Sequence, residues 1–93
     1  MKTYDLKLIT FLSQENTIMI RSTHELKMLQ KVLSSIGLQI PKHFEDTIKK
    51  EGPIFLEYCN WKGFSYYNDR QQSVDWYESE PFEVADIIKE TSE

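Results

Sequence analysis

The sequence predicts an α+β fold, with a mostly antiparallel sheet of about five strands and helices packed on one face. One observation is the aromatic-rich stretch 54–78, which holds eight of the chain's twelve Phe, Tyr and Trp residues. Such residues favour strands because they pack well on a pleated surface. The other is a capped amphipathic pattern over residues 23–36. The expected order is strand, strand, helix, helix, strand, strand, strand, helix (β-β-α-α-β-β-β-α), in a single domain spanning residues 1–93.

The first two predicted strands form a hairpin. In residues 3–12, Tyr4, Leu6 and Leu8 alternate with polar residues before the alternation breaks. A strand with a bulge accounts for this pattern, and a helix is the alternative. Residues 17–21 are a short β-branched strand, and the polar stretch between the two segments is long enough for a hairpin loop.

The clearest helix covers residues 23–36. Ser22 is followed three residues later by Glu25, the spacing of a capping box, in which each residue bonds a free backbone N–H at the helix start. Leucine, valine and isoleucine then recur every three or four residues and make one apolar stripe. Gly37 is placed to end the helix in the left-handed conformation.

Two more helices are expected. A short one over residues 42–51 follows Pro41, carries lysines in its last turn and stops at the Gly-Pro pair 52–53. The last helix begins with Pro81 at its first position, because proline lacks the N–H that is unpaired there.

The stretch 54–78 predicts a three-stranded meander. Residues 62–63, Lys-Gly, suit a two-residue turn that places Trp61 opposite Phe64, and residues 74–78 form the third strand. Aromatic side chains fall on both faces of this meander. We expect one face to pack on the helix 23–36 and the other to stay exposed.

Size and composition place limits on function. A domain of 93 residues folds alone but has little room for a deep cofactor cleft. No run approaches the roughly 20 apolar residues of a membrane span. The single cysteine, Cys59, excludes an intramolecular disulfide and fits a reducing compartment, so the cytoplasm is the expected location.

Chemical motifs are absent from the sequence, and no catalytic residue, cofactor or metal is predicted. The three glycines do not cluster, which excludes phosphate-binding loops. His24 and His43 lack further ligands at a metal-site spacing. Cys59 has no helix start or cation beside it in sequence that would make its thiol reactive. The sequence therefore predicts a protein that is not an enzyme.

The charge of the chain is unevenly distributed. The net charge is −4, with nine basic and seven acidic residues in 1–68 but two basic and eight acidic residues in 69–93. Such a field repels nucleic acid and favours a basic partner. Tyr, Trp and Arg are common interface anchors. The candidate partner-binding residues are therefore Trp61, Phe64, Tyr67, Arg70, Tyr77, Asp69, Asp75, Glu78, Glu80, Glu83 and Asp86.

One resemblance adds to these expectations. A strand runs directly into a capped helix over residues 18–26, and short aromatic strands precede the segment 81–84 and a terminal helix. This order of elements, over roughly residues 17–88, resembles small uncharacterised proteins of bacteriophages and prophages. The resemblance implies an accessory or anti-host-defence role through binding, and it carries over no functional residues. The insert at 38–53 departs from the pattern.

These observations predict a non-enzymatic protein-interaction module. A more specific form is a phage-type inhibitor whose carboxylates imitate the phosphates of a nucleic acid for a basic host protein. The alternative function is single-stranded nucleic-acid binding through the aromatic face of the sheet. Homodimerisation through an open strand edge is also compatible with the sequence.

Overall fold

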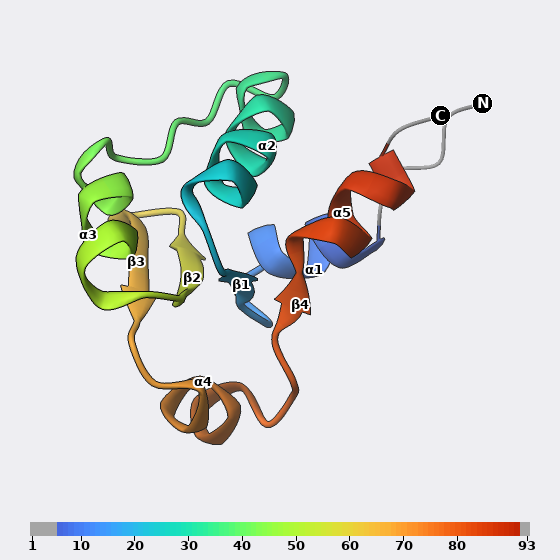
Figure 1. Cartoon of the computed structure of the whole chain (residues 1–93). Helices are drawn as coiled ribbons and strands as arrows, with labels where there is room; N and C mark the ends of the chain where they lie inside the picture. Colours follow the sequence, from blue (N-terminus) through green and yellow to red (C-terminus); the bar gives the residue numbers. More distant parts are fainter. Residues whose placement is uncertain (1–5, 92–93) are drawn as a thin grey trace.

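The computed structural model describes residues 6–91, with side chains through residue 88. Within that part of the chain it contains five helices and four strands (Figure 1), which confirms the α+β class but not the predicted order. The elements are α1 (Leu6–Leu12), β1 (Ile18–Ile20), α2 (Thr23–Ser34), α3 (His43–Glu51), β2 (Ile54–Cys59), β3 (Gly63–Tyr67), α4 (Arg70–Tyr77), β4 (Phe82–Glu83) and α5 (Val84–Thr91).

The sheet is mixed and has the strand order β3-β2-β1-β4. β2 pairs antiparallel with both β1 and β3. β4 pairs parallel with β1, with Ile18 opposite Phe82. The prediction of about five mostly antiparallel strands was therefore wrong in the strand count and in the orientation of the last strand.

One face of the sheet carries the hydrophobic core. Ile18 and Ile20 of β1 lie beside Leu56 and Ile54 of β2, and all four are fully buried. Side chains of α1, α2, α3 and α5 cover this face, with Phe11, Leu29, Leu33 and Ile87 also fully buried. Burying one such side chain contributes roughly 1.5–3 kcal/mol.

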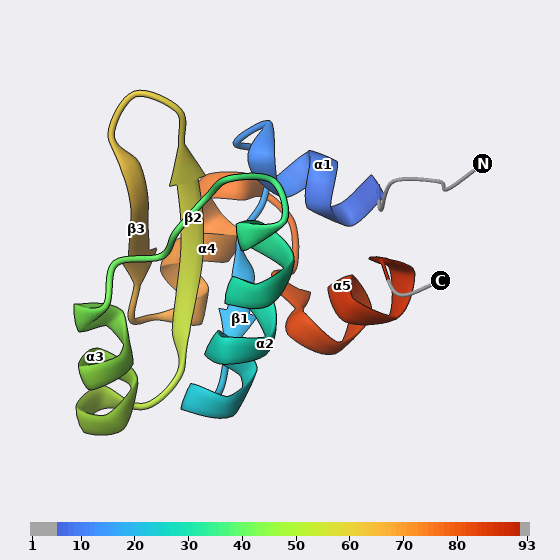
Figure 2. The ribbon, with the colours of Figure 1, turned by 90° about the horizontal axis from the view of Figure 1, so that it is seen from above.

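α4 lies on the opposite face of the sheet, so the prediction that helices pack on one face holds for four helices and fails for this one. In Figure 1, α2 and α4 lie on opposite sides of the strands, and Figure 2 shows α2 in front of the sheet and α4 behind it. The tyrosine hydroxyl of Tyr77 on α4 donates to Glu57. Glu57 points away from the core because neighbouring strand residues alternate between faces.

The first predicted strand is a helix in its described part. Leu8 and Phe11 are three residues apart on one side of α1 and are buried, whereas Leu6 and Ile9 are exposed. This is the helical period that was the alternative interpretation. The predicted hairpin does not form, because β1 pairs with β2 and β4; residues 3–5 lie outside the described residues.

α2 has the predicted cap. The Ser22 hydroxyl accepts a hydrogen bond from the Glu25 N–H at 3.2 Å. The Glu25 carboxylate returns a bond to the N–H of Arg21, one residue earlier than the capping box predicts. Gly37 has a φ of 82°, and the N–H groups of Gly37 and Leu38 bond back into the last turn, as in a Schellman ending. α3 and its stop at Gly52 also match the prediction.

The β2–β3 hairpin has a different register from the predicted one. Its loop contains residues 60–62, since Cys59 pairs with Gly63 and Tyr58 with Phe64. The Lys62 N–H bonds the Cys59 carbonyl oxygen, and Gly63 follows with a φ of 85°, the pattern of a three-residue loop with a glycine bulge. The pairing of β3 with β2 is thus shifted by three residues from the predicted one. Because the shift is an odd number, each side chain of β3 lies on the opposite face of β2 from the one predicted, and Phe64 is on the core side.

The predicted third strand of the meander, residues 74–78, lies almost entirely in the helix α4. Asp69 caps this helix by accepting from the Gln71 N–H at 3.0 Å, and Glu78 ends it with a φ of 56°. The capping aspartate favours helix more strongly than the aromatic residues favour strand.

The last helix begins at Val84 rather than at Pro81. Two residues of strand, β4, come first, and the Phe82 N–H bonds the Thr17 carbonyl oxygen at 2.9 Å. Proline lacks an N–H and therefore precedes the strand without losing a bond of the sheet.

Candidate functional site

A groove lies between the β2–β3 hairpin and α4, on the face of the sheet opposite the core. Its volume is about 440 Å³, within the range of known ligand sites. We call it the tryptophan groove. The residues that line it are Gln14, Glu57, Tyr58, Cys59, Trp61, Lys62, Tyr67, Trp76 and Tyr77.

Two exposed tryptophans give the groove its character. Trp61 in the hairpin loop is 79% exposed, and Trp76 on α4 is 72% exposed. They are the only tryptophans in the sequence. The Lys62 ammonium lies 5.8 Å from the centre of the Trp61 ring, within the range of a cation–π interaction. Large aromatic side chains left in water in this way typically mark a contact surface.

Glu57 supplies the fixed carboxylate of the groove. One of its oxygens accepts from the Ser65 hydroxyl and the other from the Tyr77 hydroxyl, each at 2.6 Å. Burial raises the pKa of the Tyr77 phenol far above its usual value, and the bond to Glu57 adds to that rise. Burial and the charge of Glu57 also raise the pKa of Tyr67. Both phenols therefore stay neutral as the pH rises past their usual range.

Buried polar contacts fix α4 against the sheet. The hydroxyls of Thr17 and Ser73 are 2.7 Å apart, and both side chains are fully buried. The Asn16 amide, 1% exposed, donates to the Glu80 carbonyl oxygen at 2.8 Å, and its own oxygen accepts from the Thr17 N–H. These bonds attach α4, the helix that carries Trp76, to the sheet at the centre of the helix and through the segment after it.

The predicted aromatic site residues divide between the two faces. Trp61, Tyr67 and Tyr77 line the groove. Phe64 packs on the core side, with its ring centre 5.2 Å from that of Tyr58 and 6.3 Å from that of Phe11.

The predicted charged residues are distributed along the C-terminal part of the chain. Arg70 forms an ion pair with Glu80, so both belong to the α4 region. Asp69 caps α4, Asp75 accepts from the Gln71 amide on the same helix, and Glu78 ends it.

Two further carboxylates lie on β4 and α5. Glu83 pairs with Arg21 at 2.6 Å, and this bond lowers the pKa of the Glu83 carboxyl. Asp86 is exposed on α5. The acidic candidates are therefore spread along α4, the loop after it, β4 and α5.

The sequence-based prediction did not include Glu57, Lys62 or Trp76 in the site. Trp76 was assigned to a strand, and a helix that starts at the Asp69 cap is the signal that would have placed it. The role of Glu57 depends on the hairpin register, which brings Ser65 directly opposite it.

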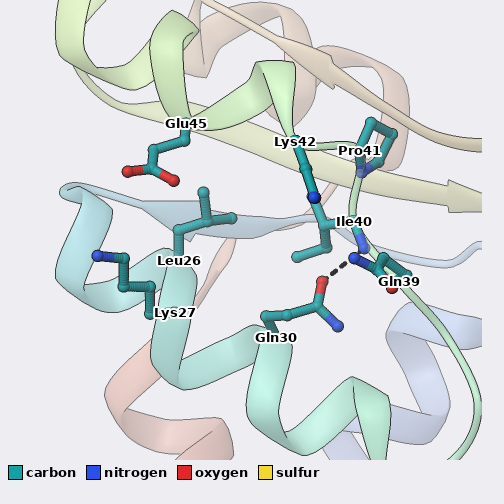
Figure 3. Close-up of a pocket in the computed structure, with 8 residues that line it drawn as sticks. All are labelled: Leu26, Lys27, Gln30, Gln39, Ile40, Pro41, Lys42 and Glu45. Atoms are coloured by element: carbon teal, nitrogen blue, oxygen red, sulfur yellow. Dashed lines mark hydrogen bonds between the residues drawn. The ribbon is translucent and has the colours of Figure 1, made fainter.

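A second, smaller hollow of about 110 Å³ lies between α2 and the segment that leads into α3 (Figure 3). Gln30 points from α2 to that segment, where its amide oxygen accepts from the Ile40 N–H at 2.6 Å and its nitrogen donates to the Leu38 carbonyl oxygen. The Gln30 amide thus uses both of its ends to attach this segment to α2. We therefore interpret the hollow as part of the packing between the two and not as a binding site.

Comparisons with protein-family models, curated proteins and solved structures gave no match to this chain. Among the described residues there is no group of three or more histidine, cysteine or acidic side chains arranged to hold a metal ion. No described helix has the length and apolar character needed to cross a membrane.

Proposed function

We propose that this protein is a non-enzymatic protein-interaction module whose tryptophan groove receives a segment of a partner protein. The supporting observation is the pair of exposed tryptophans that line the groove, Trp61 and Trp76. Tryptophan and tyrosine dominate the binding energy of protein interfaces because they bury a large area with few rotatable bonds.

The expected partner is basic. Glu57 lies in the groove, and residues 69–93 hold eight acidic and two basic side chains. A more specific proposal is a phage-type accessory protein or inhibitor whose carboxylates imitate a phosphate track. Glu80 and Glu83 are ion-paired within the chain, which reduces their share of that field. Asp75, Glu78 and Asp86 are therefore the better candidates for such a track.

Single-stranded nucleic-acid binding is the second candidate function. The exposed tryptophan rings could stack on bases, and Lys62 lies beside one of them. The Glu57 carboxylate and the acidic C-terminal quarter would repel phosphates, so we place this function second.

The test is quantitative binding of a captured partner to matched variants. Trp61→Ala with Trp76→Ala should weaken binding about 30-fold or more, the effect of losing one hot spot of about 2 kcal/mol. Leu6→Ala is the control, because Leu6 is 73% exposed but lies on α1 outside the groove. Equal binding by the double variant and the control would refute the proposal.

A gel-shift titration with single-stranded oligonucleotides at low salt tests the second candidate. We expect no shift. A shift that disappears in the double tryptophan variant would establish nucleic-acid binding in place of the protein-interaction function.

A further inference from the structure

We infer that the tryptophan groove binds the guanidinium group of an arginine side chain of the partner. This inference rests on the proposed function and specifies its chemistry. It combines three features of the groove: a carboxylate with remaining acceptor capacity, two exposed indole rings and a lysine ammonium group near the face of one of those rings.

The first feature is the carboxylate of Glu57. Each of its oxygens accepts one short hydrogen bond, from Ser65 or from Tyr77. The Tyr67 phenol also lies within hydrogen-bonding reach of Glu57. An ionised carboxylate offers about four acceptor sites, so about one remains for an incoming donor. The two existing bonds fix the plane of the group. A guanidinium can donate one charge-assisted N–H bond to that remaining site while its plane stays free to stack on a ring.

The second feature is the pair of indole rings. Trp61 and Trp76 come from different elements and line the same groove as Glu57. An indole face attracts a cation through its quadrupole, and tryptophan does so best among the aromatic residues. A planar guanidinium also stacks on such a face, which an ammonium group does not. This difference favours arginine over lysine.

The third feature is the position of Lys62. Its ammonium group lies 5.8 Å from the centre of the Trp61 ring. Lys62 directly follows Trp61 in the sequence, so this contact is local, and the flexible stem of the exposed lysine lets its ammonium group move away. Lys62 is then an internal competitor for an incoming arginine, and its charge limits the affinity.

The chemistry of the groove argues against an anionic occupant. The fixed charges among its lining residues are Glu57 and Lys62, and the lysine is exposed at the rim. Tyr67 and Tyr77 are neutral near pH 7, because even an unperturbed tyrosine phenol has a pKa of about 10. A phosphate or a carboxylate that entered would meet Glu57 directly.

The experiment compares peptides that differ in one side chain. A short peptide with one arginine is titrated into the full chain, and peptides with citrulline or lysine at that position are the controls. Citrulline has nearly the shape of arginine but no charge. Tryptophan fluorescence is the readout, because both tryptophans of the chain line the groove. We expect the arginine peptide to bind about tenfold more tightly than the citrulline peptide, the effect of one charge-assisted contact.

Variants assign that preference to the groove. Glu57→Gln should remove the difference between arginine and citrulline, and Lys62→Gln should increase the affinity for arginine. Trp61→Phe and Trp76→Phe leave one fluorescent ring each and should each weaken arginine binding. Trp61 is so exposed that its replacement leaves the fold intact, so this variant remains informative even if Glu57→Gln destabilises the protein.

The inference fails if arginine and citrulline bind equally, or if the preference for arginine persists in both Glu57→Gln and Trp61→Phe. These outcomes are separate from failure of the proposed function. Loss of the captured partner in the double tryptophan variant, with equal binding of the two peptides, keeps the interaction module and refutes the arginine site. Partner binding that survives in that double variant refutes the tryptophan groove as the binding site for the partner and, with it, a partner as the source of the arginine.

Discussion

The contact between Thr17 and Ser73 gives a quantitative test of how α4 is attached. Their hydroxyls are 2.7 Å apart, both side chains are fully buried, and the residues are 56 positions apart in the chain. Ser73→Ala removes one hydroxyl and deprives the other of this partner in the interior. Thr17→Val does the same from the other side with little change of shape.

The expected magnitude follows from the burial. A buried polar group that loses its partner costs about 1–3 kcal/mol, so each single variant should lose about 2 kcal/mol of the free energy of unfolding. When both hydroxyls are removed, no unpaired group remains, so the double variant should lose less than either single variant, about 1 kcal/mol or less rather than about 4 kcal/mol. A loss of about 2 kcal/mol lowers the Tm of a domain this size by about 10 °C.

The assay is urea unfolding of the wild type, the two single variants and the double variant, followed by circular dichroism. Ser13→Ala is the control, because Ser13 is exposed and should change stability by less than about 0.5 kcal/mol. The reasoning is refuted if the single effects add in the double variant, or if either single variant is as stable as the control.

Three further predictions concern Tyr77 of α4, Gly63 of the hairpin and the ion pair between Arg21 and Glu83. Tyr77→Phe should lose about 1 kcal/mol at pH 8, because the phenol donates to Glu57 at a partly exposed site. The pKa of Tyr77 is raised in the folded state, so its contribution to stability is complete below about pH 10 and is lost as the pH rises through the folded pKa. Between pH 8 and pH 10.5, the free energy of unfolding in urea should therefore fall less for Tyr77→Phe than for the wild type. Gly63→Ala should cost about 1–2 kcal/mol in thermal unfolding from its φ of 85° alone, since an added Cβ would meet no atom within 4 Å; Gly63→Asn should cost less, and equal losses would contradict this explanation. Arg21 lowers the pKa of the Glu83 carboxyl, so the contribution of this carboxyl is present at neutral pH and is lost as the pH falls through that lowered pKa. The difference in urea unfolding between wild type and Glu83→Gln should therefore shrink in acid and in high salt, and a difference that stays constant would contradict the ion-pair explanation.

The parts of the fold that could be predicted from the sequence have local causes. The cap at Ser22 and the left-handed Gly37 act within a few residues, and the structure confirms both. The strand at 17–21 and the helix at 42–51 are likewise present, because their apolar pattern and their stop signals lie within the segments themselves.

The predictions from sequence were wrong where the secondary structure of a segment depends on distant contacts or on competing local signals. Residues 74–77 have strand-like composition, but the Asp69 cap and the burial of Ser73 against Thr17 favour helix. The two-residue β4 forms because it pairs with β1, and nothing within those two residues indicates this. The groove depends on the helix α4 and on the hairpin register, neither of which was predicted. Trp61 was therefore predicted in the site, whereas Trp76 was not.

The strand order β3-β2-β1-β4 has a consequence for folding during synthesis. β1 is only three residues long, yet it lies between a strand that follows some 35 residues later and one that follows some 60 residues later. On the ribosome, β1 emerges long before either neighbour and has no partner for its backbone groups. The local helix α2 can form early, but the sheet closes only when residues 82–83 have been made. A strand translated some 60 residues after β1 therefore completes its pairing, and a truncation before Phe82 would leave one edge of β1 open to other chains.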